Sequence, residues 1–402
     1  MALKATWLGR ESIERIADIR LRCYGNSPGE RDAFIRKTEI DCSADGDVLV
    51  LADDTGDVAT ATSLSLTMNV RGTHLPCQGV AWVGTVRSHR RRRIDGHGLA
   101  STVMHALANK ARERGQAVSM LAPFRVSFYE SFGYGIAERQ NEWTVPLRIL
   151  PDGDAGQFAE YRDADFDSAL ASRRRQFERT HGDIRTDAVR LDSWIKTLQP
   201  LGFRMIDRQG DRVVSQFTLG TEIVDGRAIA VVHRPFYESI DALKRLLTML
   251  GTLKDQYSAA RVGLPADLPI NWLLAERQVP HRRVDHPAAR CRAITRMQVK
   301  IAETPEVIAA LTPANGVSGL LTIDVAGQAW RIEIADGHAT ATTSTHQADL
   351  ACDAKVWAAL VMGDLPVKTA ADLGLLTAGT PAALPLLADL VAGPAPFCHE
   401  YF

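Results

Sequence analysis

Apolar and polar positions alternate along the N-terminal third of the chain in a way that predicts a succession of helices and strands. Residues 13–24 place isoleucine and leucine on one helical face and are followed by Gly25, so a helix is expected to end there. Residues 47–53 and 59–70 predict strands, and the second alternates small or polar with larger apolar residues, as a half-buried antiparallel strand does. Residues 79–86 are apolar almost throughout, which is typical of a central strand buried on both faces.

A basic loop and a helix follow this central strand. Residues 89–97 hold four consecutive arginines and a glycine. Residues 98–115 then repeat an apolar residue at every fourth position and end in a second glycine, which predicts an amphipathic helix with a glycine stop. A strand (117–123), a short helix (127–133) and another strand (142–147) complete the predicted order of the first domain.

The remaining pattern predicts two further domains. A polar stretch with glycines after residue 147 predicts a linker, and strands with a long helix follow it without a second basic glycine loop. Near the C-terminus, strands separated by glycine turns precede three apolar segments that predict helices, 348–363, 367–379 and 381–393. We therefore expect an α/β (α+β) protein with three consecutive domains, 1–147, 148–288 and 289–402.

Length and charge exclude several classes of protein. The 402 residues exceed what one hydrophobic core usually organises, and 47 basic and 48 acidic side chains give a net charge of -1. Because there is no overall basic field, nucleic acid is not an expected partner. The six cysteines lack metal-binding spacing, and no apolar run is long enough for a signal peptide or a membrane span. We therefore expect a cytoplasmic protein that binds neither metal nor membrane.

The basic loop is a candidate seat for phosphate groups. The first backbone N–H groups of a helix lack partners inside the helix, and together with the helix dipole they favour anions. Arginines beside that start add charge-assisted hydrogen bonds. Judged alone, an arginine run is more often a solvated loop. The chain has no GxxxxGK[ST] and no GxGxxG with an acidic residue on a second strand, so nucleotide sites of these two kinds are not expected.

The order of elements around the basic loop resembles the GCN5-related N-acetyltransferases (GNAT), and the segment SFYESFGYG resembles the short helix and turn after their fifth strand. The whole chain, which ends in an aromatic residue, is similar to the enhanced intracellular survival (Eis) acetyltransferases. This resemblance implies tandem GNAT-fold domains with mixed central sheets, the second without a phosphate loop, and a sterol-carrier-protein-like α+β C-terminal domain. It also implies transfer of an acetyl group from acetyl-CoA to an amine.

The resemblance implies which residues bind acetyl-CoA. Family members carry a run of basic residues and then a glycine that opens the helix, and here this pattern aligns with residues 91–93 and Gly98, interrupted by an insertion of residues 94–97 that adds Asp95. A second register, Arg93-x-x-Gly96-x-Gly98, also fits. A backbone N–H near Thr85 and Val86 is expected to stabilise the oxyanion. The expected cofactor-binding residues are Gly84, Thr85, Val86, Arg91, Arg92, Arg93, Gly98, Leu99 and Ala100.

Two residues are expected to transfer protons. Tyr129, on the short helix, falls at the position of the family's general acid, and its hydroxyl can protonate a departing thiolate. In the Eis family the terminal carboxylate accepts the proton of the amine, and here that carboxylate belongs to Phe402. Such a group ordinarily has a pKa of about 3.5, which burial raises. The alternatives are simple packing of Tyr129 among aromatic rings and an ordinary packed C-terminal strand at Phe402.

The acceptor is the least determined part of the prediction. Trp82 on the central strand and Glu400 near the terminus are the expected substrate-binding residues, although Trp82 could instead fill the core. Acidic residues near the first helices would attract a cation, namely Glu30, Asp32, Glu39 and Asp41. Three hypotheses remain: transfer to a cationic small molecule such as an aminoglycoside-like amine or polyamine, transfer to a lysine of a peptide, or a non-catalytic lipid-binding protein. The resemblance also implies a homo-oligomer, often a hexamer.

Overall fold

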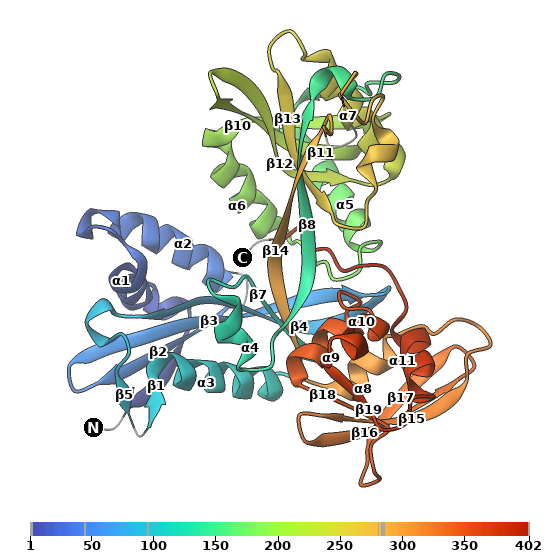
Figure 1. The fold of residues 1–402 in the computed structure, drawn as a ribbon. Coiled ribbons are helices and arrows are strands. Elements are labelled where there is room, and N and C mark those ends of the chain that lie inside the picture. The colour runs from blue at the N-terminus through green and yellow to red at the C-terminus, as the bar shows by residue number, and fades with distance from the viewer. Residues whose placement is uncertain (1–2, 44–45, 95, 280, 283–285, 401–402) are drawn as a thin grey trace. The chain divides into compact units, whose positions relative to one another are not determined.

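The computed structural model describes residues 3–43, 46–94, 96–279, 281–282 and 286–400, which form two compact units (Figure 1). The first unit contains the chain up to Ala137 and then Met297–Pro394, whereas the second contains Glu138–Arg296 and Ala395–Glu400. The mixed α/β class predicted from the sequence is confirmed. The units follow contacts rather than chain order, so the three consecutive domains remain a prediction.

The first unit is built on a mixed sheet in the order β1-β2-β3-β4-β7-β14. The strands are β1 (Lys4–Leu8), β2 (Asp47–Asp53), β3 (Gly56–Val70), β4 (Thr73–Thr85), β7 (Val118–Leu121) and β14 (Arg290–Ile301). The β4 and β7 strands are parallel, and the end of β14 adds an antiparallel partner to β7 through residues 298–301. The sequence did not predict this last pairing, because the partners are distant along the chain.

Helices cover both faces of this sheet (Figure 1). The helices α1 (Ile13–Tyr24) and α2 (Arg31–Ser43) lie on one face, and α3 (Leu99–Glu113) and α4 (Val126–Glu130) lie on the other. On β2, Val48 and Val50 pack with α1, whereas Leu49 and Leu51 pack with α3. Burial on both sides explains why the inner strands read as nearly continuous apolar runs.

The turn between β3 and β4 is tied to the C-terminal part of the same unit. Arg71, which has a positive φ of 52°, starts this turn. Its guanidinium donates hydrogen bonds to the carbonyl oxygens of Ala392, at 2.8 Å, and Leu390, at 3.3 Å. These carbonyls end the helix α11 (Ala383–Val391), so the arginine caps groups that have no partner inside the helix.

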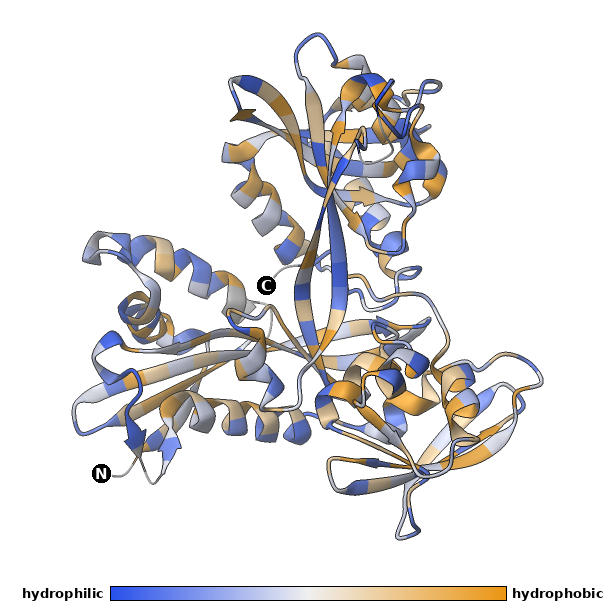
Figure 2. Ribbon diagram, in the orientation of Figure 1, coloured by the Kyte–Doolittle hydropathy of each residue, from blue (hydrophilic) through white to orange (hydrophobic). Residues whose placement is uncertain are grey.

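The C-terminal part of the first unit contains a separate sheet in the order β17-β16-β15-β18-β19. Its strands are β15 (Gly319–Val325), β16 (Gln328–Ala335), β17 (His338–Thr343), β18 (Leu350–Cys352) and β19 (Leu376–Ala378). Its helices are α8 (Thr304–Ala309), α9 (Ala354–Val361), α10 (Val367–Asp372) and α11. Figure 2 shows how strongly apolar α9 and α11 are.

Two of the predicted C-terminal helices are partly wrong. The segment 348–363 begins with β18, and the segment 367–379 ends with β19. These short apolar runs pair with each other, and β18 also pairs with β15. Apolar periodicity cannot distinguish such short strands from a turn of helix, because three residues are too few to show a period.

The second unit has a sheet in the order β8-β13-β12-β11-β10-β9. The strands are β8 (Gly135–Pro146), β9 (Phe158–Glu160), β10 (Gly202–Gln209), β11 (Arg212–Val224), β12 (Arg227–Tyr237) and β13 (Ala259–Pro265), and the helices are α5 (Phe166–Phe177), α6 (Ala188–Leu198) and α7 (Ile240–Thr252). Leucines of α7 form the core with Val232 and Val262. Helix α6 was not predicted. No helix in the described part of the chain is long and apolar enough to cross a membrane.

The two units share an irregularity at the same place in their sheets. The β3–β4 register shifts opposite Trp82, which has φ of 55°, and the β11–β12 register shifts opposite Arg234, which has φ of 47°. Each bulged strand also has a parallel neighbour, β7 or β13, and the two strands pair only near the start of that neighbour. We call the parted ends of β4 and β7 the first opening, and those of β12 and β13 the second opening.

Candidate active site

The first opening exposes one edge of β4. The β4 strand pairs with β7 only at Cys77–Gly79, so residues 80–85 continue without this neighbour. The N–H of Val86 donates to the carbonyl oxygen of Val58 at 2.9 Å, on the β3 side. Because successive amides of a strand point to opposite edges, the N–H of Thr85 faces the first opening. Of the two predicted oxyanion donors, Val86 is therefore already occupied, and Thr85 is available.

Gly84, a predicted cofactor-binding residue, has a packing role in the structure. A Cβ atom at this position would lie 2.8 Å from Cε2 and 2.9 Å from the hydroxyl oxygen of Tyr24, at the end of α1. Only glycine lets α1 approach β4 so closely. Tyr24 was missed by the sequence analysis, because a tyrosine before a helix-ending glycine gives no distinctive signal.

Two arginines of the loop after β4 bind other parts of the first unit. Arg92 forms an ion pair with Asp53 at 2.6 Å. Hydrogen bonds from Thr55 lower the pKa of Asp53 below its ordinary value, and the positive charge of Arg92 adds to this effect. Arg87, which the sequence analysis did not single out, donates to the carbonyl oxygen of Gly25 at 2.6 Å. Both contacts hold the loop against the sheet and α1.

Three other arginines of the loop, Arg90, Arg91 and Arg93, are exposed, and two of them belong to the predicted cofactor-binding set. Arg91 and Arg93 form no ion pair with another described residue, and they flank Arg92. Arg93 belongs to a short hairpin that leads into α3 and has two strands of two residues each, β5 (Arg93–Ile94) and β6 (His97–Gly98). The inserted Asp95 lies outside the described residues. The predicted set of three arginines thus separates into one that holds the loop and two that are free to meet a ligand.

The start of α3 is open to an anion. Gly98 precedes the helix and provides no side-chain cap, and the first turn contains no acidic residue. A Cβ atom at Gly98 would meet nothing within 4 Å, so the space beside it is unfilled by the protein. The first amides of the helix, including those of Leu99 and Ala100, therefore meet the requirements for binding a phosphate oxygen.

Tyr129 lies on α4 in an aromatic cluster of the first unit. Its side chain is 3% exposed and contacts the rings of Phe124, Phe128 and Tyr134. Burial raises the pKa of Tyr129 well above that of a free tyrosine, so the hydroxyl remains protonated at neutral pH. The hydroxyl makes no hydrogen bond with another described residue. Packing and proton donation are thus both compatible with this position.

Trp82, a predicted substrate-binding residue, is surrounded by aromatic and cationic side chains. Its ring lies 5.4 Å from that of Tyr24 and 6.0 Å from that of Phe34. The guanidinium carbon of Arg20 lies 4.7 Å from the ring centre, and the ammonium of Lys37 lies 5.9 Å away. Cation–π contacts already use this ring, which makes it a poor acceptor for a further cation.

Glu400, the other predicted substrate-binding residue, is buried in the second unit. It is fully inaccessible, and its carboxylate accepts a hydrogen bond from Thr186. Burial raises the pKa of Glu400 to about 7, opposed chiefly by the charge of Arg173. In this structure the carboxylate is thus held by protein groups, and its contact with a substrate stays a prediction. Phe402, the predicted base, lies outside the described residues.

The segment before the chain end is held by buried hydrogen bonds. The Phe397 N–H donates to the carbonyl oxygen of His181 at 2.9 Å, and the His399 N–H donates to Asp183 at 2.9 Å. Asp183 also pairs with Arg173 at 2.7 Å, with both side chains fully buried. Among the described residues, no group of three or more His, Cys, Asp or Glu side chains could hold a metal ion.

Comparison with known families agrees with this geometry. Residues 7–137 match the acetyltransferase (GNAT) domain family, and residues 321–399 match the sterol carrier protein domain family. The chain therefore carries a GNAT acetyltransferase domain and a sterol carrier protein domain, and it is similar to N-acetyltransferases of the GNAT type.

Particular relatives extend the likeness to most of the chain. An uncharacterized N-acetyltransferase from Streptomyces avermitilis is 25% identical over 334 residues, which cover 76% of each chain. The structure of a GCN5-related N-acetyltransferase from Anabaena variabilis aligns over 100% of both chains with a TM-score of 0.84 and 18% identity. Eis1 from Mycobacterium abscessus aligns over 100% of both chains with a TM-score of 0.79 and 18% identity. The predicted resemblance to GNAT enzymes and to the Eis fold is confirmed.

The buried carboxyl of Glu400 predicts a pH-dependent loss of stability. Its pKa is about 7 in the folded chain and 4.5 ordinarily, so the unfolded chain releases this proton first. The free energy of unfolding should therefore fall as the pH rises from about 4.5 to 7. We expect Glu400→Gln to be more stable than the wild type at pH 8, by on the order of 1–3 kcal/mol, with the advantage lost at pH 4.5. Thermal unfolding at the two pH values measures this; an equal difference at both would contradict it.

Proposed function

We propose that the first unit binds acetyl-CoA at the start of α3 and transfers its acetyl group to a primary amine. The observation that carries this proposal is the uncapped helix start beside the first opening, where the Gly98 position leaves open space. The equivalent helix of the second unit is different. Ser239 accepts a hydrogen bond from the N–H of Ala242 at 3.1 Å, and Asp241 adds a negative charge to the first turn of α7. The start of α7 is therefore less suited to an anion, and of these two helices α3 is the one whose start fits a phosphate.

The loop arginines complete this proposed seat. Arg91 and Arg93 would add charge-assisted hydrogen bonds to the diphosphate, whereas Arg92 fixes the loop through Asp53. The resemblance to GNAT enzymes supports this assignment, since their basic loop precedes the same helix. Leu99 and Ala100 would contribute their backbone amides rather than their side chains.

Acetyl-CoA supplies the activated acetyl group in the proposed reaction. A C–N bond forms between the amine and the acetyl carbon, and the C–S bond of the thioester breaks. The N–H of Thr85 would stabilise the negative charge that develops on the carbonyl oxygen. The hydroxyl of Tyr129 would give its proton to the departing thiolate. The amine must lose a proton, and the Eis resemblance assigns this step to the terminal carboxylate of Phe402.

We propose a small cationic amine, such as a polyamine or an aminoglycoside-like molecule, as the acceptor. GNAT acetyltransferases act on amines, which supports the reactive group. A second candidate, a lysine side chain of a peptide, is favoured by the surroundings of Trp82. Arg20 and Lys37 beside this ring would repel a polycation more strongly than an acceptor with one charge.

Loss of the exposed loop arginines should weaken cofactor binding. We expect Arg91→Gln or Arg93→Gln to raise the dissociation constant of acetyl-CoA about tenfold each, because each removes one charge-assisted hydrogen bond. Isothermal titration calorimetry at fixed ionic strength measures the effect. Arg148→Gln removes an arginine outside the loop and should bind acetyl-CoA like the wild type. Wild-type affinity in both loop variants would reject the proposed phosphate seat.

Removal of the Tyr129 hydroxyl should slow turnover without weakening cofactor binding. Tyr129→Phe keeps the aromatic packing but cannot donate a proton, so we expect kcat to fall about 10²–10⁴-fold. Thiol release from acetyl-CoA in the presence of an acceptor measures turnover, and calorimetry measures binding. If kcat is unchanged, Tyr129 is a packing residue and the alternative stated from the sequence holds.

Removal of Phe402 tests the proposed base and the acceptor together. The truncated chain should bind acetyl-CoA normally but release thiol about 10²–10⁴-fold more slowly, because the terminal carboxylate is displaced. Phe402→Leu keeps the carboxylate in place and should retain most activity. Spermidine, an aminoglycoside and a lysine-containing peptide serve as acceptors, and stimulation by the peptide alone would favour the second candidate. No acetyl transfer to any of them by the wild type would contradict the proposed function.

A further inference from the structure

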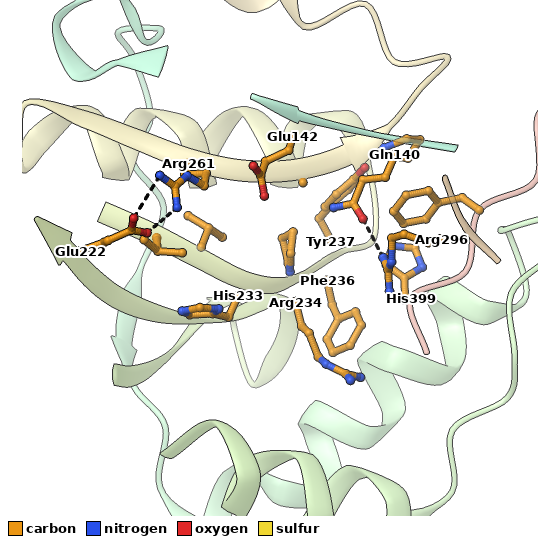
Figure 3. Close-up of a pocket in the computed structure, with 16 residues that line it drawn as sticks. Gln140, Glu142, Glu222, His233, Arg234, Phe236, Tyr237, Arg261, Arg296 and His399 are labelled. Carbon is orange, nitrogen blue, oxygen red and sulfur yellow. Dashed lines mark hydrogen bonds and ion pairs between the residues drawn. The ribbon is translucent and has the colours of Figure 1, made fainter. Parts of the chain in front are cut away.

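The second opening contains a cavity of about 360 Å³ (Figure 3). It is lined by β12 residues 231–237, by alternate residues of β8 and β13, and by Arg296, Phe397 and His399. All of these belong to the second unit. The cavity therefore occupies, in this unit, the topological place of the proposed acetyl-CoA site in the first.

The cavity lacks the features that bind a diphosphate. Only Glu238 and Ser239 separate β12 from α7, so there is no loop comparable to residues 86–98. Ser239 caps the helix start, as described above. A volume near 360 Å³ nevertheless lies within the range of small-molecule sites. Its occupant should therefore be smaller than coenzyme A and bound by the cavity walls alone.

Most of the charges that line the cavity are already matched. Arg261 pairs with Glu222 (Figure 3). Glu142 pairs with Arg292 at 2.9 Å. Arg234, which also lines the cavity, has its guanidinium carbon 4.3 Å from the centre of the Trp194 ring. Arg296 has the loosest pairing. One of its nitrogens donates to the side-chain oxygen of Gln140 at 2.8 Å, and its ion-pair distance to Glu138 is 3.8 Å, too long for a hydrogen bond.

Further lining groups are neutral donors and apolar surfaces. Burial lowers the pKa of His233, which is therefore uncharged at neutral pH, and burial raises the pKa of Tyr237, which keeps its proton. Neither side chain makes a hydrogen bond with another described residue. Phe236 and Phe397 add aromatic surface. The walls thus combine hydrogen-bond donors with an apolar face.

The adjoining surface also favours an anion. A second hollow of about 430 Å³ shares Glu142, Glu222 and Arg261 with the cavity and adds Arg290 and Arg292. Arginines outnumber carboxylates along this path, although the whole chain is nearly neutral. A local excess of positive charge raises the local concentration of an anionic ligand.

We propose that the second opening binds a small organic carboxylate, with Arg296 receiving the carboxylate and the Phe236 and Phe397 rings contacting its apolar part. This site is additional to the proposed acetyl-transfer site. It carries no catalytic step. Arginine suits a carboxylate because its planar guanidinium offers several donors in fixed directions.

Benzoate and succinate are suitable probes for calorimetry with the full-length protein. We expect saturable binding of at least one of them below about 20 mM, and binding of uncharged benzamide about tenfold weaker than that of benzoate. Arg296→Gln should weaken carboxylate binding about tenfold or more, whereas Arg227→Gln, at an exposed position of β12 outside both hollows, should not. Tyr237→Phe, which preserves packing, should weaken it severalfold.

The proposal would be overturned if neither carboxylate showed saturable binding. Equal losses in Arg296→Gln and Arg227→Gln would also overturn it, because they would indicate an effect of surface charge alone. If Arg296→Gln fails to fold, wild-type affinity in Tyr237→Phe would also reject it. Acetyl-CoA affinity should be unchanged in all three variants. Failure of acetyl transfer would leave the carboxylate result unaffected, so the two proposals are tested separately.

Discussion

The parting of β4 from β7 is the constraint on which the candidate active site depends. Three residues of β4 pair with β7, and the bulge at Trp82 then turns the strand so that its far end has one open edge. An unpaired backbone N–H in a sheet is costly unless another partner binds it. The Thr85 amide, the start of α3 and the Tyr129 hydroxyl all border this region, where a ligand would supply the missing partners.

The second unit has a similar strand arrangement, but the start of its helix is capped. In the first unit Gly98 leaves the helix amides free, whereas in the second Ser239 satisfies one of them at a gain of about 1 kcal/mol. The arginines that line the second opening lie on strands and not at the helix start. Similar strand arrangements thus accompany two different helix starts, and the residues at each start decide whether its amides are available to an anion.

Much of the fold could be predicted from the sequence because burial on both faces of the strands leaves a strong apolar signal. The bounds of β2 and the extent of α1 and α3 follow the predicted periodicity. Short buried strands such as β18 and β19 could not be predicted, since three apolar residues have no readable period. The roles of Arg92 and Glu400 were also not predictable, because each depends on a partner far away in the chain.

The sequence by itself predicted the likeness to GNAT acetyltransferases, since the basic loop between a buried strand and a helix, and the aromatic segment that follows, are local patterns that resemble those enzymes. The tertiary structure decided which of these residues are free to act. Arg92 forms an ion pair with Asp53, and Gly84 leaves room for Tyr24. The N–H of Val86 is bonded to β3, and the buried Glu400 accepts a hydrogen bond from Thr186. Spacing along a chain shows which groups can lie together, but only packing determines which hydrogen bonds and charges are already satisfied.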